Sequence, residues 1–342
     1  MKKYLLPKEG TFYKANLHCH STISDGKLTP EEIKKAYMEK GYSIIAYTDH
    51  DVMIDHSDLQ EENFLPLRGY EMEINQSKDD PNNKHPYRKC CHMCLIALEP
   101  DNKTQVCWHR EKYLFGNAVN YRDEVRFDPA LPDYDRIYSG EGISDMMQKG
   151  RENGFFVTYN HPVWSMETAE NYLGYNGMNA MEICNYGCVE AGFDDYVPYI
   201  YDEMLRNGKR IFCTANDDNH NGGDNWAHDS FGGFTMIKAD KLDYRTVTRA
   251  MEEGNMYASQ GPEIYDLYVE DDEIHITCSP CKFIQLNTGL RHSRRITAPE
   301  GETITCATFH IQHPECTYIR LTVVDEHGKP ANTRAYFMDE IQ

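Results

Sequence analysis

Residues 11–51 read TFYKANLHCHSTISDGKLTPEEIKKAYMEKGYSIIAYTDHD and carry the clearest sign of a fold in this chain. The β-prone residues 11–20 come first. The run TPEE at 29–32 is typical of a helix start, because threonine caps it, proline suits the first position and acids follow. We expect this helix to end at Gly41 and residues 43–48 to form a buried strand. The order strand, helix, strand predicts an α/β fold.

The same alternation continues toward residue 260. Further strands are expected at residues 64–74, 92–98, 155–160, 180–184 and 210–215, with helices at 143–153 and 194–207. Strands that alternate with helices favour a parallel sheet joined by crossover helices. In an α/β barrel of this kind, the chemistry lies at the carboxyl ends of the strands.

Two parts of the chain break the alternation. Residues 100–138 are polar and aromatic without a clear period, so we expect an insertion that forms a lid or a pocket wall. From about residue 262, short alternating runs such as EIHITCS and KFIQLNT indicate a small antiparallel, β-sandwich-like domain. We therefore predict a barrel over residues 1–261 and a β-domain over residues 262–342.

The charge and hydropathy of the chain limit the kinds of partner that it can bind. The formal net charge is −20, and so acidic a surface repels nucleic-acid backbones, which argues against extended DNA or RNA. No apolar run approaches the ~20 residues of a membrane span. The start MKKYLLPKEG lacks the apolar core of a signal peptide. We expect a cytoplasmic protein without membrane association, and its oligomeric state stays open.

The chain has 12 cysteines, which we expect to be reduced thiols in the cytoplasm. Cys91 and Cys94 form one CxxC pair, and Cys278 and Cys281 form another. A structural zinc site needs four ligands, and the later cysteines are not at the spacing of a zinc knuckle. Buried thiols are therefore the better interpretation.

Histidines and carboxylates fall at the boundaries of the predicted strands. His18 and His20 lie two apart, so they share one face of a strand and both imidazoles can reach one ion. His92 opens its predicted strand. The remaining candidates follow in chain order: Asp25, His50 in TDHD, Glu71, His161 in NHP, and Asp218 and His220 in DDNH.

Nitrogen and carboxylate ligands of this kind suit Zn²⁺, Mn²⁺ or Fe²⁺ and argue against copper(I) or an iron–sulfur centre. A carboxylate such as Glu71 can bridge two ions, and bridged ions ~3.5–4 Å apart can activate water. Each motif by itself also has a structural interpretation: HxH as strand histidines, TDHD as a capped turn, NHP as a strand end. Their joint order favours a metal-dependent hydrolase.

The order HxH, TDHD, a strand-borne glutamate, a histidine, NHP and DxH resembles the PHP family, the polymerase and histidinol phosphatase superfamily, over roughly residues 11–260. The resemblance implies a distorted (β/α)7, TIM-like barrel with two or three divalent metals and phosphoester hydrolysis. Residues 231–264, with FGGFTMI and MYASQGPEI, resemble the branch whose barrel is followed by a β-domain. Some members of that branch are linked to carbamate or other ester hydrolysis.

Carried over residue by residue, the resemblance implies three neighbouring metal sites. The first would be held by His18, His20, Glu71 and Asp218, the second by Glu71, His92 and His161, and the third by Asp25, His50 and His220. Several trinuclear members place a histidine where this chain has Asp25, so filling of the third site stays open. The DxH spacing selects Asp218 as the metal ligand. Asp217 is then expected to support the ligands from beside them rather than to bind the ion itself.

We predict a phosphoesterase that hydrolyses a small, anionic phosphomonoester by attack of a metal-bound hydroxide. Asp25, His50 and Glu71 are the catalytic candidates within the metal set. His228 is a candidate leaving-group acid and is interpreted equally well as a surface-loop histidine. The same site could serve a carboxyl or carbamate ester, or a binding protein without catalysis. The basic run at 291–295 is either an anion anchor or, more often, a solvated loop.

Overall fold

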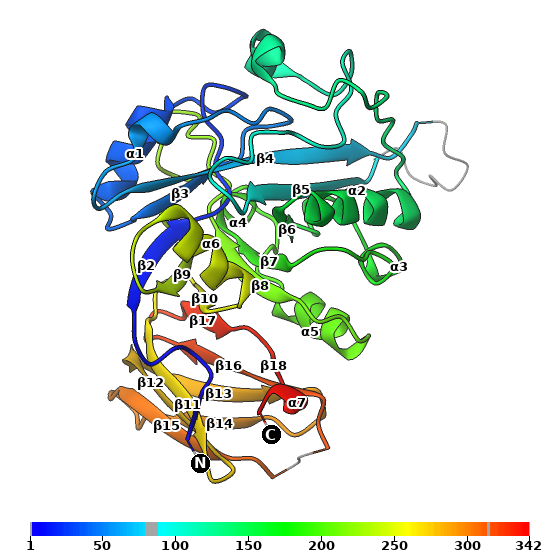
Figure 1. The fold of residues 1–342 in the computed structure, drawn as a ribbon. Coiled ribbons are helices and arrows are strands. Elements are labelled where there is room, and N and C mark those ends of the chain that lie inside the picture. The colour runs from blue at the N-terminus through cyan, green and yellow to red at the C-terminus, as the bar shows by residue number, and fades with distance from the viewer. Residues whose placement is uncertain (1, 79–87, 313–314, 342) are drawn as a thin grey trace.

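The structure, a computed structural model, describes residues 2–78, 88–312 and 315–341. Figure 1 shows helices around a large sheet in the upper part and a smaller, strand-rich part below. The strands of the upper part are β2 (Thr11–Asn16), β3 (Ile44–Tyr47), β4 (Leu65–Asn75), β5 (Cys90–Ala97), β6 (Phe155–Tyr159), β7 (Ala180–Asn185), β8 (Phe212–Asn216), β9 (Phe234–Ala239) and β10 (Met256–Ser259). Its helices are α1 (Pro30–Met38), η1 (Ser57–Leu59), η2 (Gly116–Glu124), α2 (Gly140–Glu152), α3 (Ala169–Tyr172), α4 (Tyr186–Glu190), α5 (Pro198–Arg206) and α6 (Tyr244–Glu252).

The lower part takes strands from both ends of the chain. Its elements are β1 (Lys3–Tyr4), β11 (Ile264–Glu270), β12 (Glu273–Cys281), β13 (Phe283–Thr288), β14 (Arg294–Thr297), β15 (Ile304–His310), β16 (Tyr318–Val324), β17 (Pro330–Thr333), β18 (Tyr336–Phe337) and α7 (Met338–Ile341). The large mixed sheet follows the order β14-β13-β16-β17-β10-β9-β2-β3-β4-β5-β6-β7-β8. A separate antiparallel sheet follows the order β1-β11-β12-β15. The α/β class is thus confirmed.

Local sequence explains the first strand–helix–strand unit. Thr29 and Glu32 form a capping box at the start of α1, with Pro30 in its first turn, as predicted. The chain then reverses at Gly41, whose φ of +78° lies in the left-handed region that favours glycine. Every residue of β3 is buried, because β2 and β4 flank it in parallel and helices cover the sheet.

The expectation of a parallel sheet is wrong for β5. This strand pairs antiparallel with both β4 and β6, whereas β6, β7 and β8 are parallel to one another. No helix intervenes between β4 and β5 in the described part of the chain, and strands joined without a crossover run antiparallel. A reversed strand begins at the edge where its neighbours end. His92, near the start of β5, therefore pairs with Glu73 near the end of β4.

The strand series curls back on itself. Thr235 of β9 accepts the N–H of Ala215 of β8 at 3.2 Å and donates its hydroxyl to the carbonyl of the same residue at 3.0 Å. The N–H of Leu17, just after β2, donates to the side chain of Asn216 at 3.0 Å. These contacts bring β8 beside β9 and β2. The seven-stranded closure of a barrel stays a prediction.

The lower part joins the upper one through backbone pairing. In the main sheet β10 pairs with β17, and in the second sheet β1 pairs with β11. In both sheets, backbone hydrogen bonds therefore join a strand that precedes residue 261 to a strand that follows it. Leu267 and Ile276 of one sheet share a buried cluster with Leu286 and Leu321 of the other. The two sheets therefore share one apolar core, and a β-sandwich-like domain stays a prediction. The division into two domains at residue 261 stays a prediction.

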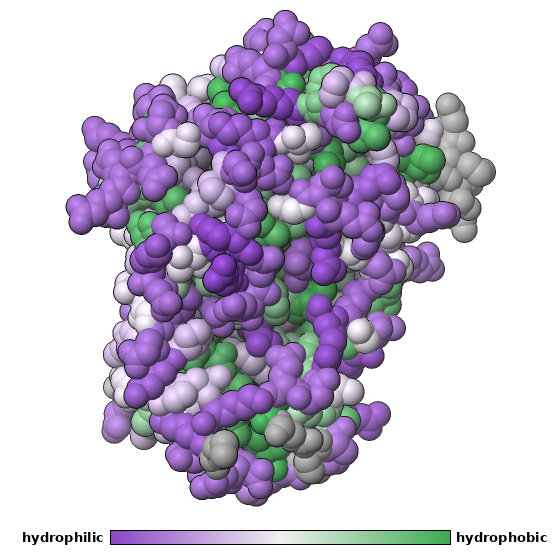
Figure 2. All heavy atoms as spheres, in the orientation of Figure 1, coloured by the Kyte–Doolittle hydropathy of each residue, from purple (hydrophilic) through white to green (hydrophobic). Residues whose placement is uncertain are grey.

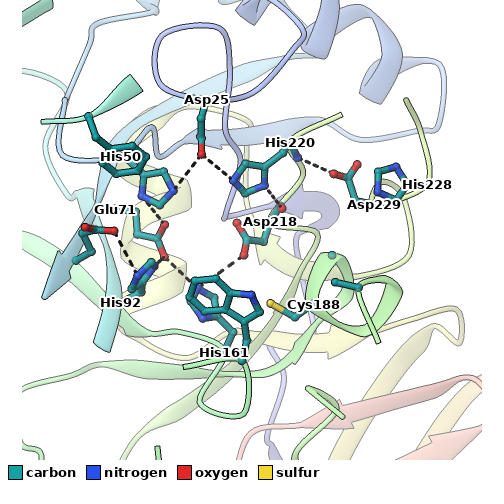
Figure 3. Close-up of a pocket in the computed structure, with 15 residues that line it drawn as sticks. Asp25, His50, Glu71, His92, His161, Cys188, Asp218, His220, His228 and Asp229 are labelled. Carbon is teal, nitrogen blue, oxygen red and sulfur yellow. Dashed lines mark hydrogen bonds and ion pairs between the residues drawn. The ribbon is translucent and has the colours of Figure 1, made fainter. Parts of the chain in front are cut away.

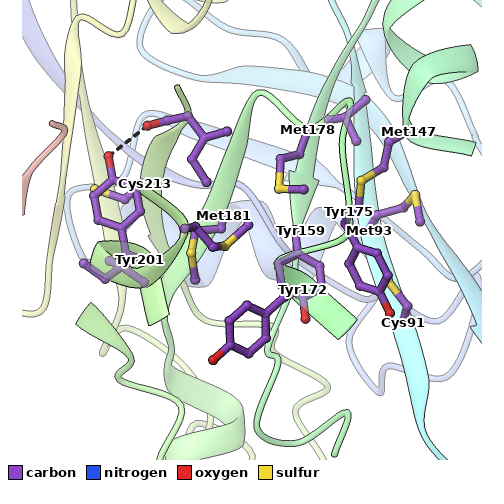
Figure 4. Close-up of a cluster of buried hydrophobic side chains, with 14 of the residues drawn as sticks. Cys91, Met93, Met147, Tyr159, Tyr172, Tyr175, Met178, Met181, Tyr201 and Cys213 are labelled. Carbon is purple, nitrogen blue, oxygen red and sulfur yellow. Dashed lines mark hydrogen bonds between the residues drawn. The ribbon is translucent and has the colours of Figure 1, made fainter. Parts of the chain in front are cut away.

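Sulfur-containing and tyrosine side chains fill much of the core beneath the large sheet (Figure 4). Cys91 and Met93 of β5 and Tyr159 of β6 belong to one cluster of buried residues. Every cysteine except Cys306 is buried, and none belongs to a candidate metal cluster within the described residues. The buried cysteines therefore serve as small apolar groups, as the buried-thiol interpretation predicts, and Cys306 is the exception.

Hydrophilic residues cover most of the face shown in Figure 2. Across residues 2–78, 88–312 and 315–341, no helix combines the length and apolar character that crossing a membrane requires.

The insertion at residues 100–138 is folded against the loops of the large sheet. Trp108, Ala118 and Val125 form a buried cluster with Ile23 and Val52, which lie in the loops after β2 and β3. Of the described residues of the insertion, Phe115 lines the cavity described below. A role of the whole insertion as a lid or pocket wall stays a prediction.

Candidate metal centre

The histidine pair follows β2 at its carboxyl end. The N–H of His20 donates to the carbonyl of Asn219 at 3.1 Å, which ties the pair to the loop after β8. The Nε2 atoms of His18 and His20 are 3.2 Å apart, and both side chains are fully buried. Two ring nitrogens this close point toward a common position, as two ligands of one ion do.

Glu71 of β4 lies at the centre of the site, between His50, His92 and His161 (Figure 3). Five imidazoles lie within 3.4 Å of its carboxylate oxygens, those of His18, His20, His50, His92 and His161. Three of these rings face Oε1 and the other two face Oε2. The two oxygens of Glu71 thus contact different histidines, as the oxygens of a carboxylate that bridges two metal ions do.

Asp218 closes the inner side of the site. Its Oδ1 lies 3.1 Å from Nε2 of His18 and 2.9 Å from Nε2 of His20, and its Oδ2 lies 3.7 Å from Nε2 of His161. Asp218 and His161 have φ values of +53° and +24°, which residues other than glycine rarely adopt. Such strained backbone clusters at functional sites, where the surrounding structure holds it in place.

Asp25 lies on the outer side of the site, nearer to solvent. Its Oδ2 is 3.8 Å from Nε2 of His50 and 3.6 Å from Nε2 of His220, and its Oδ1 is 3.8 Å from Nδ1 of His20. The side chains of Asp25 and His220 are 33% and 37% exposed, whereas Glu71 is buried. These longer distances and greater exposure describe a looser group of ligands.

Three groups of side chains can each place their ligand atoms within 4.8 Å of one another. They are His18, His20, Glu71 and Asp218; His50, Glu71 and His92; and His20, Asp25, His50 and His220. The first has the members predicted for the first ion. The second contains His50 where the prediction has His161, although His161 also contacts Glu71 at 3.2 Å. The third adds His20 to the predicted set.

The polar atoms of the site fit metal ligation. Five buried donor or acceptor atoms make no hydrogen bond of regular geometry among the described residues, although they lie close to one another: Nδ1 of His20, Nδ1 of His50, Oε2 of Glu71, Nδ1 of His92 and Oδ1 of Asp218. Buried polar atoms are normally satisfied, so five exceptions in one place require an explanation. Imidazole and carboxylate donors that converge here are the ligands of Zn²⁺, Mn²⁺ and Fe²⁺.

Charges within the site stabilise one another. Burial lowers the pKa of His18, but Asp218, Glu71 and Glu182 outweigh it and hold that pKa well above its usual value. Burial also raises the pKa of Glu71, yet His18, His92 and His50 hold it well below the ordinary range. The carboxylates therefore attract positive charge to this place, whether it arrives as protons or as divalent ions.

Glu182 of β7 is a site residue that the sequence analysis missed. Its Oε1 lies 2.8 Å from Nδ1 of His18 and accepts from Nδ2 of Asn216 at 3.0 Å. Its Oε2 accepts from Nδ2 of Asn185 and from the N–H of His161 at 3.0 and 3.2 Å. A glutamate within the otherwise apolar strand AMEIC was the available signal.

Asp217 turns away from the ligands. It accepts the N–H groups of Phe231, Gly232 and Gly233 at 2.8 to 2.9 Å and the hydroxyl of Tyr37 at 2.8 Å. Burial raises the pKa of Asp217 to about 6 despite these bonds. Its contacts anchor the turn between β8 and β9, as expected of a neighbour that supports a ligand.

A cavity of about 400 Å³ opens above the ligands, and His228 lines it beside Asp229 (Figure 3). The ring of His228 is exposed, and its Nδ1 lies 2.8 Å from the carbonyl of Asn225. The structure thus brings this histidine to the cavity edge. The basic run at 291–295 lies outside the cavity lining, and Arg295 instead binds Gln285 within the β-domain.

The described residues thus combine a mixed α/β fold with a cluster of imidazole and carboxylate groups at its strand ends that fits divalent metal ions. The sequence profile of the PHP domain matches residues 16–189, just over half of the chain. The chain belongs to the PHP domain family. The matched span contains the ligand candidates from His18 to His161, whereas Asp218 and His220 lie beyond it.

Two curated proteins share shorter stretches with this chain. The DNA polymerase/3'-5' exonuclease PolX of Bacillus subtilis is 35% identical over 79 residues, which cover 18% of this chain and 14% of the polymerase. The 5'-3' exoribonuclease of Haemophilus influenzae is 42% identical over 48 residues, which cover 14% of this chain and 18% of the exoribonuclease. The chain thus spans less than a fifth of either relative.

Solved structures give a distant likeness. A two-domain protein from Bacteroides vulgatus that contains a predicted PHP-like metal-dependent phosphoesterase has a TM-score of 0.45 and 15% identity, covering 98% of both chains. An amidohydrolase from Chromobacterium violaceum has a TM-score of 0.38 and 13% identity, covering 71% of this chain and 96% of its own.

Proposed function

We propose that the protein is a phosphoesterase that hydrolyses a small phosphomonoester at the centre around Glu71. The observation that carries this proposal is the position of one buried carboxylate among five imidazoles, all within 3.4 Å of its oxygens. Two or three divalent ions, of zinc, manganese or iron, would supply an activated water and neutralise charge on the ester oxygens. The curled sheet would form the distorted barrel that presents this site.

The chain's own residues would divide the work. Glu71 would bridge two ions, because it belongs to two of the groups whose ligand atoms converge. His18, His20 and Asp218 would hold the inner ion and His92 and His161 the second. Asp25, His50 and His220 would hold a third ion near solvent, where Asp25 and His220 are one-third or more exposed.

His228 would donate the proton that a poor leaving group needs. Its exposed ring lies at the cavity edge, and its Nδ1 contacts the carbonyl of Asn225. In the doubly protonated ring, Nδ1 would donate to that carbonyl and Nε2 would carry the proton that passes to the ester oxygen.

A carboxyl or carbamate ester is the second candidate for the same site. The observation that favours it is the cavity lining, which contains no lysine or arginine among the described residues. Arginine is the usual bidentate partner of phosphate oxygens, whereas an uncharged ester needs no such partner.

The test is hydrolysis by protein that has been stripped of metal and reloaded with zinc, manganese or iron. Phosphomonoesters and carboxyl esters are assayed side by side, and bound metal is measured by mass spectrometry. We expect turnover of phosphomonoesters that a chelator abolishes. A preference for carboxyl esters would replace the leading proposal with the second candidate.

The variant Glu71→Gln tests whether the Glu71 carboxylate bridges metal ions or has only a structural role. This variant should retain less metal per chain and lose at least ~100-fold in turnover, because its amide cannot neutralise two cations. Glu270→Gln, on β11 in the β-domain, is the matched control and should keep both properties. Full activity of the Glu71 variant would contradict the bridging role.

A further inference from the structure

The cavity above the metal centre has aromatic walls that hydrolysis by itself does not require. Phe115 of the insertion and Trp164 of the loop after β6 both line it. Their side chains are 37% and 38% exposed, although large apolar residues inside a folded chain are usually buried. Two half-exposed rings at one opening indicate contact with a ligand.

The two rings extend a band of rings that belongs to the metal centre. The ring centroid of Phe115 is 4.8 Å from that of His50, and the centroid of Trp164 is 5.3 Å from that of His92. The rings of His50 and His92 are themselves 5.7 Å apart. The band Phe115–His50–His92–Trp164 therefore forms one side of the cavity.

Small residues line the cavity at helix α4. Gly187, Cys188 and Ala191 are the lining residues from this helix and from the residue after it. A Cβ atom at Gly187 would lie 2.7 Å from the carbonyl oxygen of Asp217, so no larger residue fits there without a shift. Small side chains at this end of α4 leave the cavity open beside the candidate metal ligands.

Apart from its histidines, the charged residues that line the cavity are all acidic. Its charged lining residues are Asp25, Glu71, Glu73, Asp218 and Asp229, and no lysine or arginine lines it in the part of the chain that the structure describes. Glu73 and Asp229 are not among the proposed metal ligands. A ligand with a second anionic group would meet this acidic lining, in which histidine and backbone N–H groups are the partners of the two carboxylates: Glu73 lies 3.5 Å from Nε2 of His92, and Asp229 accepts the N–H groups of His220 and Asn221.

We propose that the substrate carries one anionic ester group at the metals and a planar, uncharged aromatic group that Phe115 and Trp164 hold. This inference rests on the proposed function and narrows its substrate class. Aromatic rings gain from edge and face contacts with other rings beyond simple burial, and saturated groups of equal size do not. The acidic lining disfavours bisphosphates and nucleic-acid strands.

Three substrates with leaving groups of similar basicity test the inference by turnover. They are benzyl phosphate, cyclohexylmethyl phosphate and 4-carboxybenzyl phosphate. The metal-loaded enzyme should show the highest kcat/KM for benzyl phosphate, about three- to tenfold above the cyclohexyl compound. The added carboxylate should lower kcat/KM. Equal values for the benzyl and cyclohexyl esters, or a preference for the carboxylate, would overturn the inference.

Two variants locate the contact. Trp164→Leu and Phe115→Leu should each raise KM for benzyl phosphate about three- to tenfold and raise the KM for cyclohexylmethyl phosphate by a smaller factor. Tyr265→Leu, which alters a 49%-exposed ring on β11, is the matched control and should change none of these values. Equal loss on both substrates in the two cavity variants would contradict an aromatic contact.

Binding separates this inference from the proposed function. Benzylphosphonate cannot be hydrolysed, and its affinity for the metal-loaded protein is measured by calorimetry against cyclohexylmethylphosphonate. Tighter binding of the benzyl compound that Trp164→Leu removes would support the aromatic wall even if no phosphoester were turned over. Turnover of phosphomonoesters without any benzyl preference in binding would uphold the hydrolase and overturn the aromatic class.

Discussion

At the scale of single residues, Glu182 sets the orientation of a ligand that it supports from behind. Its carboxylate holds Nδ1 of His18 at 2.8 Å, so Nε2 is the nitrogen that faces Glu71 and Asp218. A carboxylate behind a ligand imidazole fixes the tautomer and makes the ring a stronger base. The side chains of Asn185 and Asn216 hold the carboxylate in turn.

Glu182→Gln should therefore weaken metal binding rather than abolish the site. We expect a loss of about 10–100-fold in metal affinity, because the amide no longer strengthens the basicity of His18. Excess metal should restore most of the turnover, and a titration of stripped protein measures both effects. Glu203→Gln on α5, whose partner is Tyr172, is the control. Loss of turnover that excess metal does not restore would contradict a positioning role.

At the scale of elements, one buried ion pair fastens the insertion to the loop that carries His50. Arg136 pairs with Asp51 and also donates to the carbonyl of Glu73 at 2.7 Å. Burial raises the pKa of Asp51 to about 6 even with the guanidinium beside it. The pair is fully enclosed, with side-chain exposures of 1% and 0%.

Arg136→Met should be strongly destabilising because it leaves Asp51 buried without its partner. Breaking such a pair costs about 3–5 kcal/mol of unfolding free energy. The double variant Asp51→Asn/Arg136→Met should recover part of this loss, since it leaves no uncompensated charge. Urea unfolding with a chelator present measures all four proteins of the cycle. Simple additivity of the two single changes would show that the pair is not coupled.

The loop after β6 has its own anchor in Glu167. Three tyrosine hydroxyls donate to this buried carboxylate, those of Tyr138, Tyr159 and Tyr175. Burial raises the pKa of Glu167 above its usual value, and the three hydroxyls only partly offset this. The loop between His161 and α3 is thereby fixed, and Trp164 with it.

This raised pKa predicts how stability changes with pH. The folded protein binds the Glu167 proton more tightly than the unfolded chain does. The contribution of this group to stability is therefore lost as pH rises from the unfolded pKa, near 4.5, through the raised folded value. The unfolding free energy of the wild type minus that of Glu167→Gln should fall over this window and then level off. Urea unfolding of both proteins in chelator measures it, and a difference that grows with pH would contradict the raised pKa.

At the scale of the whole molecule, backbone pairing joins the two parts. β10 has β9 on one side and β17 on the other, and β1 of the N-terminus completes the second sheet beside β11. Removal of the lower strands would expose the edge of β10 and the apolar face around Tyr257. An open, apolar sheet edge is prone to aggregation.

A chain that ends at residue 261 should therefore aggregate or fold poorly, although the profile of the family ends well before that point. Size-exclusion chromatography and circular dichroism of the truncated and full-length proteins measure this. A monomeric, metal-binding fragment of residues 1–261 would show instead that the predicted domain division describes an independent unit.

Local patterns were sufficient for several parts of this protein. The capping residues of α1 and the apolar run of β3 follow from neighbouring side chains, so their elements were predictable. The ordered His, Asp and Glu motifs also pointed to a shared site, and the structure brings all nine predicted ligands around one cavity floor. Glu182 was missed because its importance depends on His18, which is distant in the chain.

The sequence by itself determined the ligand types, their order and the α/β class, because these depend on residue chemistry and short-range periodicity. Only the tertiary structure decided that β5 runs backwards, which carries His92 to the same edge as Glu71 although it opens its strand. It also decided that Phe115 of the insertion stands over His50. Strand direction and such contacts depend on pairing between distant segments, and a local pattern does not encode their energies.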